Sequence, residues 1–190
     1  MTTDFQHPPL VRFKPVATWV LIGLNLLVWA AIMLTGSQNS PLVPQLALVP
    51  GMGLRHQWVT SAFTHVGIAH LGMNMLSLYF IGPALEQFFG HARYLAIYIA
   101  SMLGGSALVA FLSPTFSATL GASGCIFGLL GTYLVLALRH RQDLRGVLFW
   151  LIANLIFTFT PGVSWQGHIG GLLAGTLASV LLTRPQKPAA

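Results

Sequence analysis

Apolar residues in this chain are gathered into six long runs, separated by polar or glycine- and proline-rich links. The runs cover residues 16–35, 69–89, 94–112, 123–138, 147–160 and 168–183. A bilayer core about 30 Å thick is crossed by a helix of about 20 predominantly apolar residues. The pattern therefore predicts an all-α, polytopic membrane protein with six transmembrane helices.

Two parts of the pattern are irregular. At a rise of about 1.5 Å per residue, the run 123–138 covers about 24 Å, which is less than the bilayer core. One end of this span should therefore be submerged. The longest link, 36–68, is rich in proline and glycine with amphipathic patches, so we expect it to lie partly in the membrane interface.

Composition strengthens the membrane assignment. The chain has 190 residues, of which 55% are hydrophobic and 6% charged, whereas soluble domains carry about 25% charged residues. Length and pattern favour one domain over 16–183, with short tails at 1–15 and 184–190. The net charge of +6 comes from singly scattered basic residues, which disfavours nucleic acid as a partner. The single cysteine, Cys125, excludes an internal disulfide and a cysteine-based zinc site.

Positive charges predict the orientation, because cytoplasmic loops are enriched in Lys and Arg. With both tails cytoplasmic, only Arg55 lies outside, and eight basic residues lie inside: Arg12, Lys14, Arg93, Arg139, Arg141, Arg145, Arg184 and Lys187. Arg139 then marks the inner end of the fourth span. Its submerged end is the outer one, which carries Ser123. We expect an integral protein of a bacterial inner (plasma) membrane.

Polar residues converge at one depth. The second, fourth and sixth spans all run from outside to inside, so their first turns lie in the same leaflet. These turns carry His70 and Asn74, then Ser123, then Gln166 and His168. Polar side chains within a span are energetically costly and are functional candidates by default. Each residue alone could serve helix packing or capping; their convergence is what favours chemistry.

Small residues on the fourth and sixth spans predict a close helix contact of the small-xxx-small kind. Such a contact would bring His168 to Ser123. The residues expected to pack around this site are Gly121, Gly124, Phe127, Gly128, Gly171 and Gly175.

The acidic residues restrict the mechanism, since the chain has only Asp4, Glu86 and Asp143. No pair of intramembrane carboxylates exists for aspartyl proteolysis, and the segment HVGIAH lacks the His-Glu-x-x-His spacing of a zinc protease. Asp4 and Asp143 are expected on the cytoplasmic side, and Glu86 lies about 18 Å along the helix from Asn74. A Ser-His-acid triad is therefore ruled out.

A Ser-His dyad remains. In it, a neutral His168, held by packing, would take the Ser123 proton as general base and return it to the leaving group. His70, the Asn74 amide and the Ser123 backbone N–H are the candidate donors to the oxyanion. The α/β-hydrolase elbow is disfavoured, because GASGC has a cysteine in place of the last glycine and follows a loop between spans.

Three segments in order, HVGIAHLGMNM (65–75), GASGCIFGLLG (121–131) and GHIGGLLAG (167–175), resemble the rhomboid intramembrane serine proteases. The resemblance covers about residues 16–183. It implies a six-helix rhomboid bundle in which Ser123 is the nucleophile and His168 the base, while His70 and Asn74 stabilise the oxyanion. It also implies cleavage of single-pass membrane proteins within the bilayer, without metal, ATP or nucleotide.

The chain departs from the family pattern at two positions. Many members have Trp-Arg in the first long loop, whereas here Val59 follows Trp58, so a bracing arginine contact is either absent or supplied by Arg55. Many also place a tyrosine four residues after the serine, where this chain has Phe127. Phenylalanine keeps an aromatic ring for His168 but offers no hydroxyl.

Two alternatives stay open. A non-catalytic relative would bind or escort other membrane proteins, although such relatives typically lack the serine or the histidine. A small transporter would need polar groups across the whole membrane, whereas those of this chain gather in one leaflet.

Overall fold

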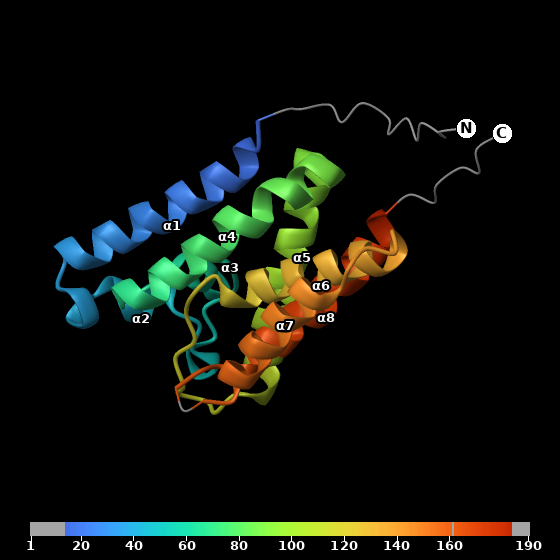
Figure 1. Ribbon diagram of the computed structural model, residues 1–190. Helices are drawn as coiled ribbons and strands as arrows, with labels where there is room; N and C mark the ends of the chain where they lie inside the picture. Colours follow the sequence, from blue (N-terminus) through green and yellow to red (C-terminus); the bar gives the residue numbers. More distant parts are fainter. Residues whose placement is uncertain (1–13, 161, 184–190) are drawn as a thin grey trace, which may run out of the picture.

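The computed structural model describes residues 14–160 and 162–183, and the described part of the chain is helical (Figure 1). Its six long helices are α1 (Val16–Leu34), α4 (Ile68–Phe89), α5 (His91–Leu112), α6 (Ser123–Arg139), α7 (Arg145–Thr158) and α8 (Trp165–Leu182). Each begins and ends within three residues of one predicted apolar run. The prediction of an all-α polytopic bundle is confirmed.

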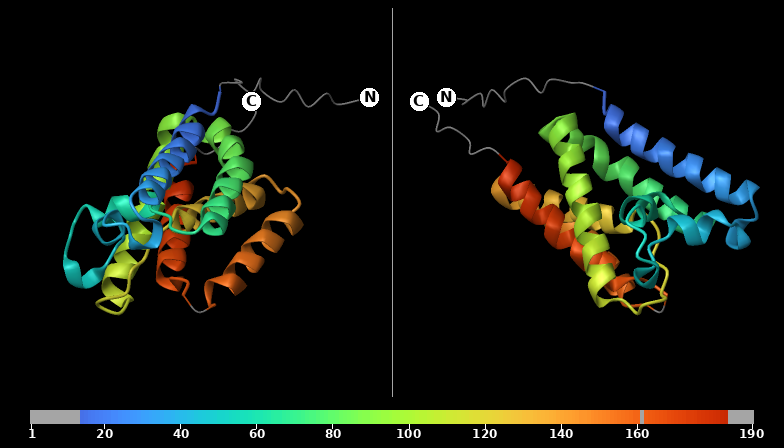
Figure 2. Two further views of the ribbon diagram at one scale, coloured as in Figure 1. Left: turned by 90° about the vertical axis from the view of Figure 1, so that its left-hand side faces the viewer. Right: turned by 180° about the vertical axis from the view of Figure 1, so that it is seen from behind.

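Three helices, α1, α4 and α5, are long and apolar enough to cross a membrane, while α6 and α7 are shorter apolar helices. The start of α1 and the end of α8 lie on the same side of the bundle (Figures 1 and 2), as an even number of spans requires. The tails were predicted at 1–15 and 184–190. Of these residues, 1–13 and 184–190 lie outside the part of the chain that the structure describes.

Helices α5, α6 and α8 pack backbone against backbone. A methyl group added at Gly171 of α8 would lie 2.0 Å from the carbonyl oxygen of Gly124 on α6. On the other side of α8, a methyl group at Gly170 would lie 2.4 Å from the carbonyl oxygen of Gly104 on α5. Only glycine allows backbones this close. The glycines therefore set the separation of the three helices.

A buried carboxylate joins α1 to α4. Glu86 is fully buried, and its oxygens accept hydrogen bonds from the Ala17 and Thr18 N–H groups at 2.8 Å each and from the Thr18 hydroxyl at 2.7 Å. His91 Nδ1 is a further partner of this carboxylate. Because the first N–H groups of a helix lack acceptors within it, and carry partial positive charge, Glu86 satisfies the start of α1.

The long link between α1 and α4 is folded into short elements, which the apolar pattern does not predict. They are η1 (Ser37–Asn39), α2 (Leu42–Leu46), η2 (Pro50–Met52), α3 (Gln57–Thr60) and η3 (Ser61–Phe63). Gln57 is fully buried; its Oε1 accepts from the Val49 N–H at 3.1 Å and its amide donates to the Pro44 carbonyl at 2.9 Å. Arg55 is exposed. Gln57 therefore braces this loop from within.

Two contacts tie the folded link to the rest of the bundle. The Ser106 hydroxyl of α5 donates to the Trp58 carbonyl at 2.8 Å. Leu48 and Thr119 exchange backbone hydrogen bonds of 2.8 and 2.9 Å. Because Thr119 lies just before α6, the folded link supports the segment that leads to Ser123.

Candidate active site

A tight turn places Ser123 at the first position of α6. Gly121 has a φ of +111°, and its N–H donates to the Ser61 carbonyl at 2.8 Å. A methyl group at Gly121 would lie 2.6 Å from the ring of His70, so the turn requires glycine for both conformation and space. Gly121 was predicted to serve helix packing; the structure instead places it in this turn, against His70.

Ser123 and His168 meet across the glycine contact between α6 and α8. Ser123 Oγ lies 2.7 Å from His168 Nε2, a normal hydrogen-bond distance. His168 is buried at 7% exposure, while Ser123 is partly exposed. A methyl group at Gly124 would lie 2.9 Å from the Gly167 carbonyl oxygen. Gly124 and Gly167, which lie next to Ser123 and His168 in the chain, are therefore small enough to let α6 and α8 come this close.

Phe127 lies beneath the imidazole. Its ring stacks on that of His168 with centroids 4.3 Å apart and planes 16° from parallel. Phe127 follows Ser123 by four residues on α6, so both reach the same side of the helix. The stacked ring restricts the tilt of the imidazole, but it has no polar atom for either ring nitrogen.

A hydroxyl from α7 occupies the other nitrogen of the imidazole. Thr158 Oγ1 lies 2.8 Å from His168 Nδ1, and the Thr158 side chain is fully buried. Thr158 was not predicted from the sequence, because it is one of several polar residues in the fifth apolar run. His168 is therefore held by a hydrogen bond as well as by the packing that was predicted.

Two predicted oxyanion donors come from α4. His70 lies against the turn at Gly121, and the Asn74 side-chain amide donates to the His70 carbonyl of its own helix at 3.0 Å. An amide nitrogen carries two hydrogens, so Asn74 keeps a second N–H for another acceptor. Gln166 points elsewhere, because its amide donates to the Leu112 carbonyl at the end of α5 at 3.4 Å.

His65 also contacts the turn that precedes Ser123. It is fully buried, its Nε2 accepts from the Ala122 N–H at 3.4 Å, and its ring meets that of His70 edge to face at 4.9 Å. Burial, together with the nearby His70, lowers the pKa of His65 to about 4, so the ring is neutral at ordinary pH. From the sequence, His65 had been considered only as a zinc ligand. Within 14–160 and 162–183, no group of three His, Cys, Asp or Glu residues could hold a metal ion.

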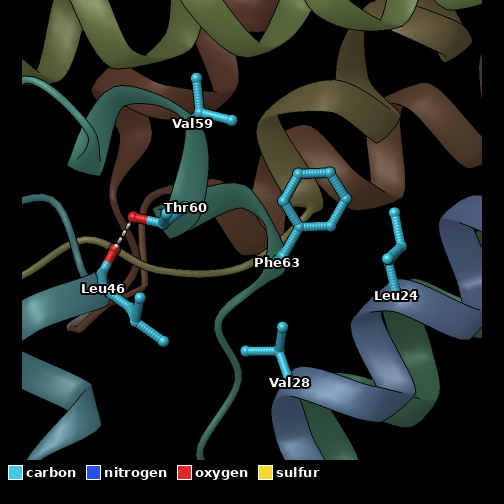
Figure 3. A pocket seen from close by; sticks show the side chains of 6 residues that line it. All are labelled: Leu24, Val28, Leu46, Val59, Thr60 and Phe63. Carbon is cyan, nitrogen blue, oxygen red and sulfur yellow. Dashed lines mark hydrogen bonds between the residues drawn. The ribbon is translucent and has the colours of Figure 1, made fainter.

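Two hollows lie away from the Ser-His pair. One, of about 190 Å³, lies between α1 and the folded link; apart from Thr60, whose hydroxyl is bonded to the Leu46 carbonyl, its lining is apolar (Figure 3). The other, of about 280 Å³, lies where the links before α6 and α8 meet, with Ser113, Thr119, Ser164 and Gln166 in its lining. The polar groups of this second hollow can hold water. One of its lining residues, Gln166, precedes His168 by two residues.

The arrangement can carry out nucleophilic acyl chemistry. The imidazole of His168 faces the hydroxyl of Ser123 at hydrogen-bond distance. The serine begins a helix, where free N–H groups and the helix dipole favour negative charge. These are the groups that base-assisted attack on a carbonyl requires.

The chain is similar to known proteins over most of its length. The family model described as "Rhomboid domain" matches residues 53–185. The chain is similar to "Rhomboid protease GluP" of Bacillus subtilis, with 35% identity over 91% of this chain and 36% of that protein. It is 40% identical to "RHOMBOID-like protein 5" of Arabidopsis thaliana over 93% of this chain and 57% of that one.

A relative of similar length also exists. "Putative rhomboid protease YdcA" of Bacillus subtilis is 30% identical over 98% of this chain and 96% of that protein. By contrast, the chain spans between a third and three fifths of the two relatives above.

Proposed function

The chain belongs to the rhomboid family, and on that premise we propose that it is an intramembrane serine endopeptidase. Ser123 is the nucleophile and His168 the general base of a dyad that cleaves protein substrates in or near their transmembrane segments. The observation that carries this proposal is the 2.7 Å contact between Ser123 Oγ and His168 Nε2 at the start of α6.

The reaction follows from the positions of these atoms. Ser123 Oγ attacks the substrate carbonyl carbon while its proton passes to His168 Nε2. The tetrahedral intermediate collapses as His168 returns the proton to the leaving amine nitrogen, so the C–N bond breaks and an acyl-enzyme remains. Water, activated by the same nitrogen, then releases the acid and restores the serine.

The oxyanion is stabilised at the mouth of the turn. The Ser123 backbone N–H, the His70 ring and the second N–H of Asn74 supply donors, aided by the dipole at the start of α6. Each donor removed from such a set lowers the rate by about 100- to 1,000-fold.

We further propose that the protein acts in a bacterial inner membrane with both tails cytoplasmic, and that its substrates are single-pass membrane proteins. In this orientation Ser123 lies below the outer surface. The excess of basic residues on the tails and inner links supports it.

A serine-directed fluorophosphonate probe tests the proposal without a known substrate. In native membranes the wild type should be labelled on Ser123, and Ser123→Ala should abolish both labelling and cleavage of a reporter transmembrane substrate. Ser179→Ala is the matched control, because Ser179 is buried on α8 and its hydroxyl donates only to a carbonyl of its own helix. An unlabelled wild type would favour the non-catalytic role of binding other membrane proteins.

A further inference from the structure

The imidazole of His168 has a partner on each nitrogen, and the two partners come from different helices. Nε2 contacts Ser123 of α6 at 2.7 Å, and Nδ1 contacts Thr158 of α7 at 2.8 Å. Thr158 Oγ1 also lies 2.8 Å from the Asn154 carbonyl oxygen, one turn earlier on α7. The threonine hydroxyl therefore lies between a backbone carbonyl and the catalytic imidazole.

These contacts favour one placement of the hydrogens. A carbonyl oxygen only accepts, so both contacts of the Thr158 hydroxyl are hydrogen bonds when its single hydrogen points to Asn154. The threonine oxygen then has only lone pairs for His168, which requires a hydrogen on Nδ1. A neutral imidazole has one N–H, so Nε2 keeps its lone pair toward the Ser123 hydroxyl. This is the tautomer that a general base needs.

We propose that Thr158 is a positioning residue that fixes the tautomer and orientation of His168; this rests on the proposed protease function. It performs the orienting part of the role that a carboxylate has in a Ser-His-Asp triad. A hydroxyl brings no negative charge into the membrane. Its bond to Nδ1 strengthens when His168 becomes positively charged during the reaction.

Burial of one face of α7 keeps the hydroxyl in place. Val147 and Leu151 are buried, Leu155 packs partly against the core, and Thr158 is fully buried. These positions lie four, eight and eleven residues along the helix and form one stripe. The stripe packs α7 on the bundle with Thr158 at its end.

Three variants test the assignment kinetically. Thr158→Val removes the hydroxyl with little change in shape, Thr158→Ser restores it, and Thr132→Val is the matched control. Thr132 is a fully buried threonine on α6. Its hydroxyl also lies near the carbonyl four residues earlier, at 2.8 Å, and near a group of a second helix, the Gly175 carbonyl of α8, at 3.4 Å. We expect kcat to fall about 10- to 100-fold in Thr158→Val with KM unchanged, the range for a lost hydrogen bond to a charged group. Thr158→Ser should regain most of the rate, and Thr132→Val should keep it.

The tautomer is measured directly by ¹⁵N NMR of histidine-labelled protein in bicelles. The chain has seven histidines, and the His168 signal is identified by its loss in His168→Ala. Wild type should show hydrogen on Nδ1, and Thr158→Val should shift the signal toward a mixture of tautomers. Hydrogen on Nε2 in the wild type, or an unchanged kcat in Thr158→Val, would overturn the assignment.

Failure of this proposal differs from failure of the proposed function. If the wild type is neither labelled by fluorophosphonate nor active, the protease function fails. If the wild type is active and Thr158→Val is equally active, only the role of Thr158 fails. A loss in Thr158→Val that serine does not rescue also contradicts the hydroxyl's role, because it assigns the effect to packing.

Discussion

The two sides of His168 are built in different ways. On the side of Ser123, α6 and α8 touch through glycine backbones, and a methyl group at Gly171 has no room. On the opposite side, α7 buries a single stripe of side chains and leaves large residues such as Phe149 and Ile156 about 70% exposed. Helix α6 contacts α8 through its backbone, whereas α7 contacts His168 through the hydroxyl of Thr158.

The difference separates two requirements of a dyad. The distance between nucleophile and base depends on backbone separation, which side-chain motion cannot easily change. The orientation of the imidazole depends on what touches its ring, namely Phe127 below and Thr158 beside it. Changes to the glycine contact should therefore be more damaging than changes to either ring contact.

The largest effect is expected for Gly171→Ala. The new methyl group would lie 2.0 Å from the Gly124 carbonyl oxygen, so α8 must move away from α6. A displacement of about 1 Å in an active site costs about 100-fold in rate, and overpacking costs about 1–3 kcal/mol of stability. Cleavage assays and unfolding in detergent measure both. Gly23→Ala, where nothing lies within 4 Å, is the control and should behave as wild type; an active Gly171→Ala would contradict the distance argument.

The next effect concerns His65, which holds the turn before α6. The folded protein keeps this ring neutral, since its pKa is lowered from 6.5 to about 4, whereas the unfolded chain binds a proton near pH 6.5. Stability therefore decreases as the pH falls from about 6.5 to about 4, by on the order of 3 kcal/mol. Unfolding in detergent at several pH values measures the slope. His65→Asn should show a smaller acid slope than the wild type, and equal slopes would exclude His65 as the cause.

A smaller effect is expected for Phe127→Leu. Leucine keeps the apolar contact but loses the stacking on His168 at 4.3 Å, and aromatic pairs contribute about 0.5–1.5 kcal/mol beyond their buried area. We expect kcat to fall about 3- to 10-fold. Phe127→Tyr keeps the ring and should retain most of the rate. A rate for leucine equal to that of wild type would show that the glycine contact and Thr158 suffice.

The smallest effect is expected on the exposed face of α7. Phe149 is 69% exposed, so Phe149→Leu should change stability by less than about 0.5 kcal/mol and leave kcat unchanged. The comparison with Thr158→Val on the same helix locates the influence of α7 in its buried stripe. A loss of activity in Phe149→Leu similar to that of Thr158→Val would contradict this.

Apolar runs were enough to predict the long helices, because six stretches of this composition have few alternatives to crossing a membrane. The short helices within 36–68 were not predicted. They are held by hydrogen bonds between the Gln57 side chain and backbone groups, and a periodic pattern of apolar residues does not identify such bonds. His70, Asn74, Ser123 and His168 stood out because each is polar near the start of an apolar run. The structure brings two of them, Ser123 and His168, to hydrogen-bond distance.

Thr158 could not be distinguished in the same way. Threonine is common in membrane helices, where its hydroxyl can bond to its own backbone, and Asn154 and Thr160 lie in the same run. Only the packing of α7 shows which of them reaches His168. The packing role of Gly104 was not predicted for a similar reason. The sequence of α5 is that of an ordinary transmembrane helix, and only the structure shows that Gly104 contacts α8.

The carboxylate of Glu86 also has a consequence for biogenesis. The start of α1 leaves the ribosome almost 70 residues before its partner, so the Ala17 and Thr18 N–H groups must first be satisfied by water or lipid headgroups. They exchange these for Glu86 only once α4 has been inserted. The contact that fixes the start of α1 therefore forms only after the part of the chain that makes α4 has been synthesised.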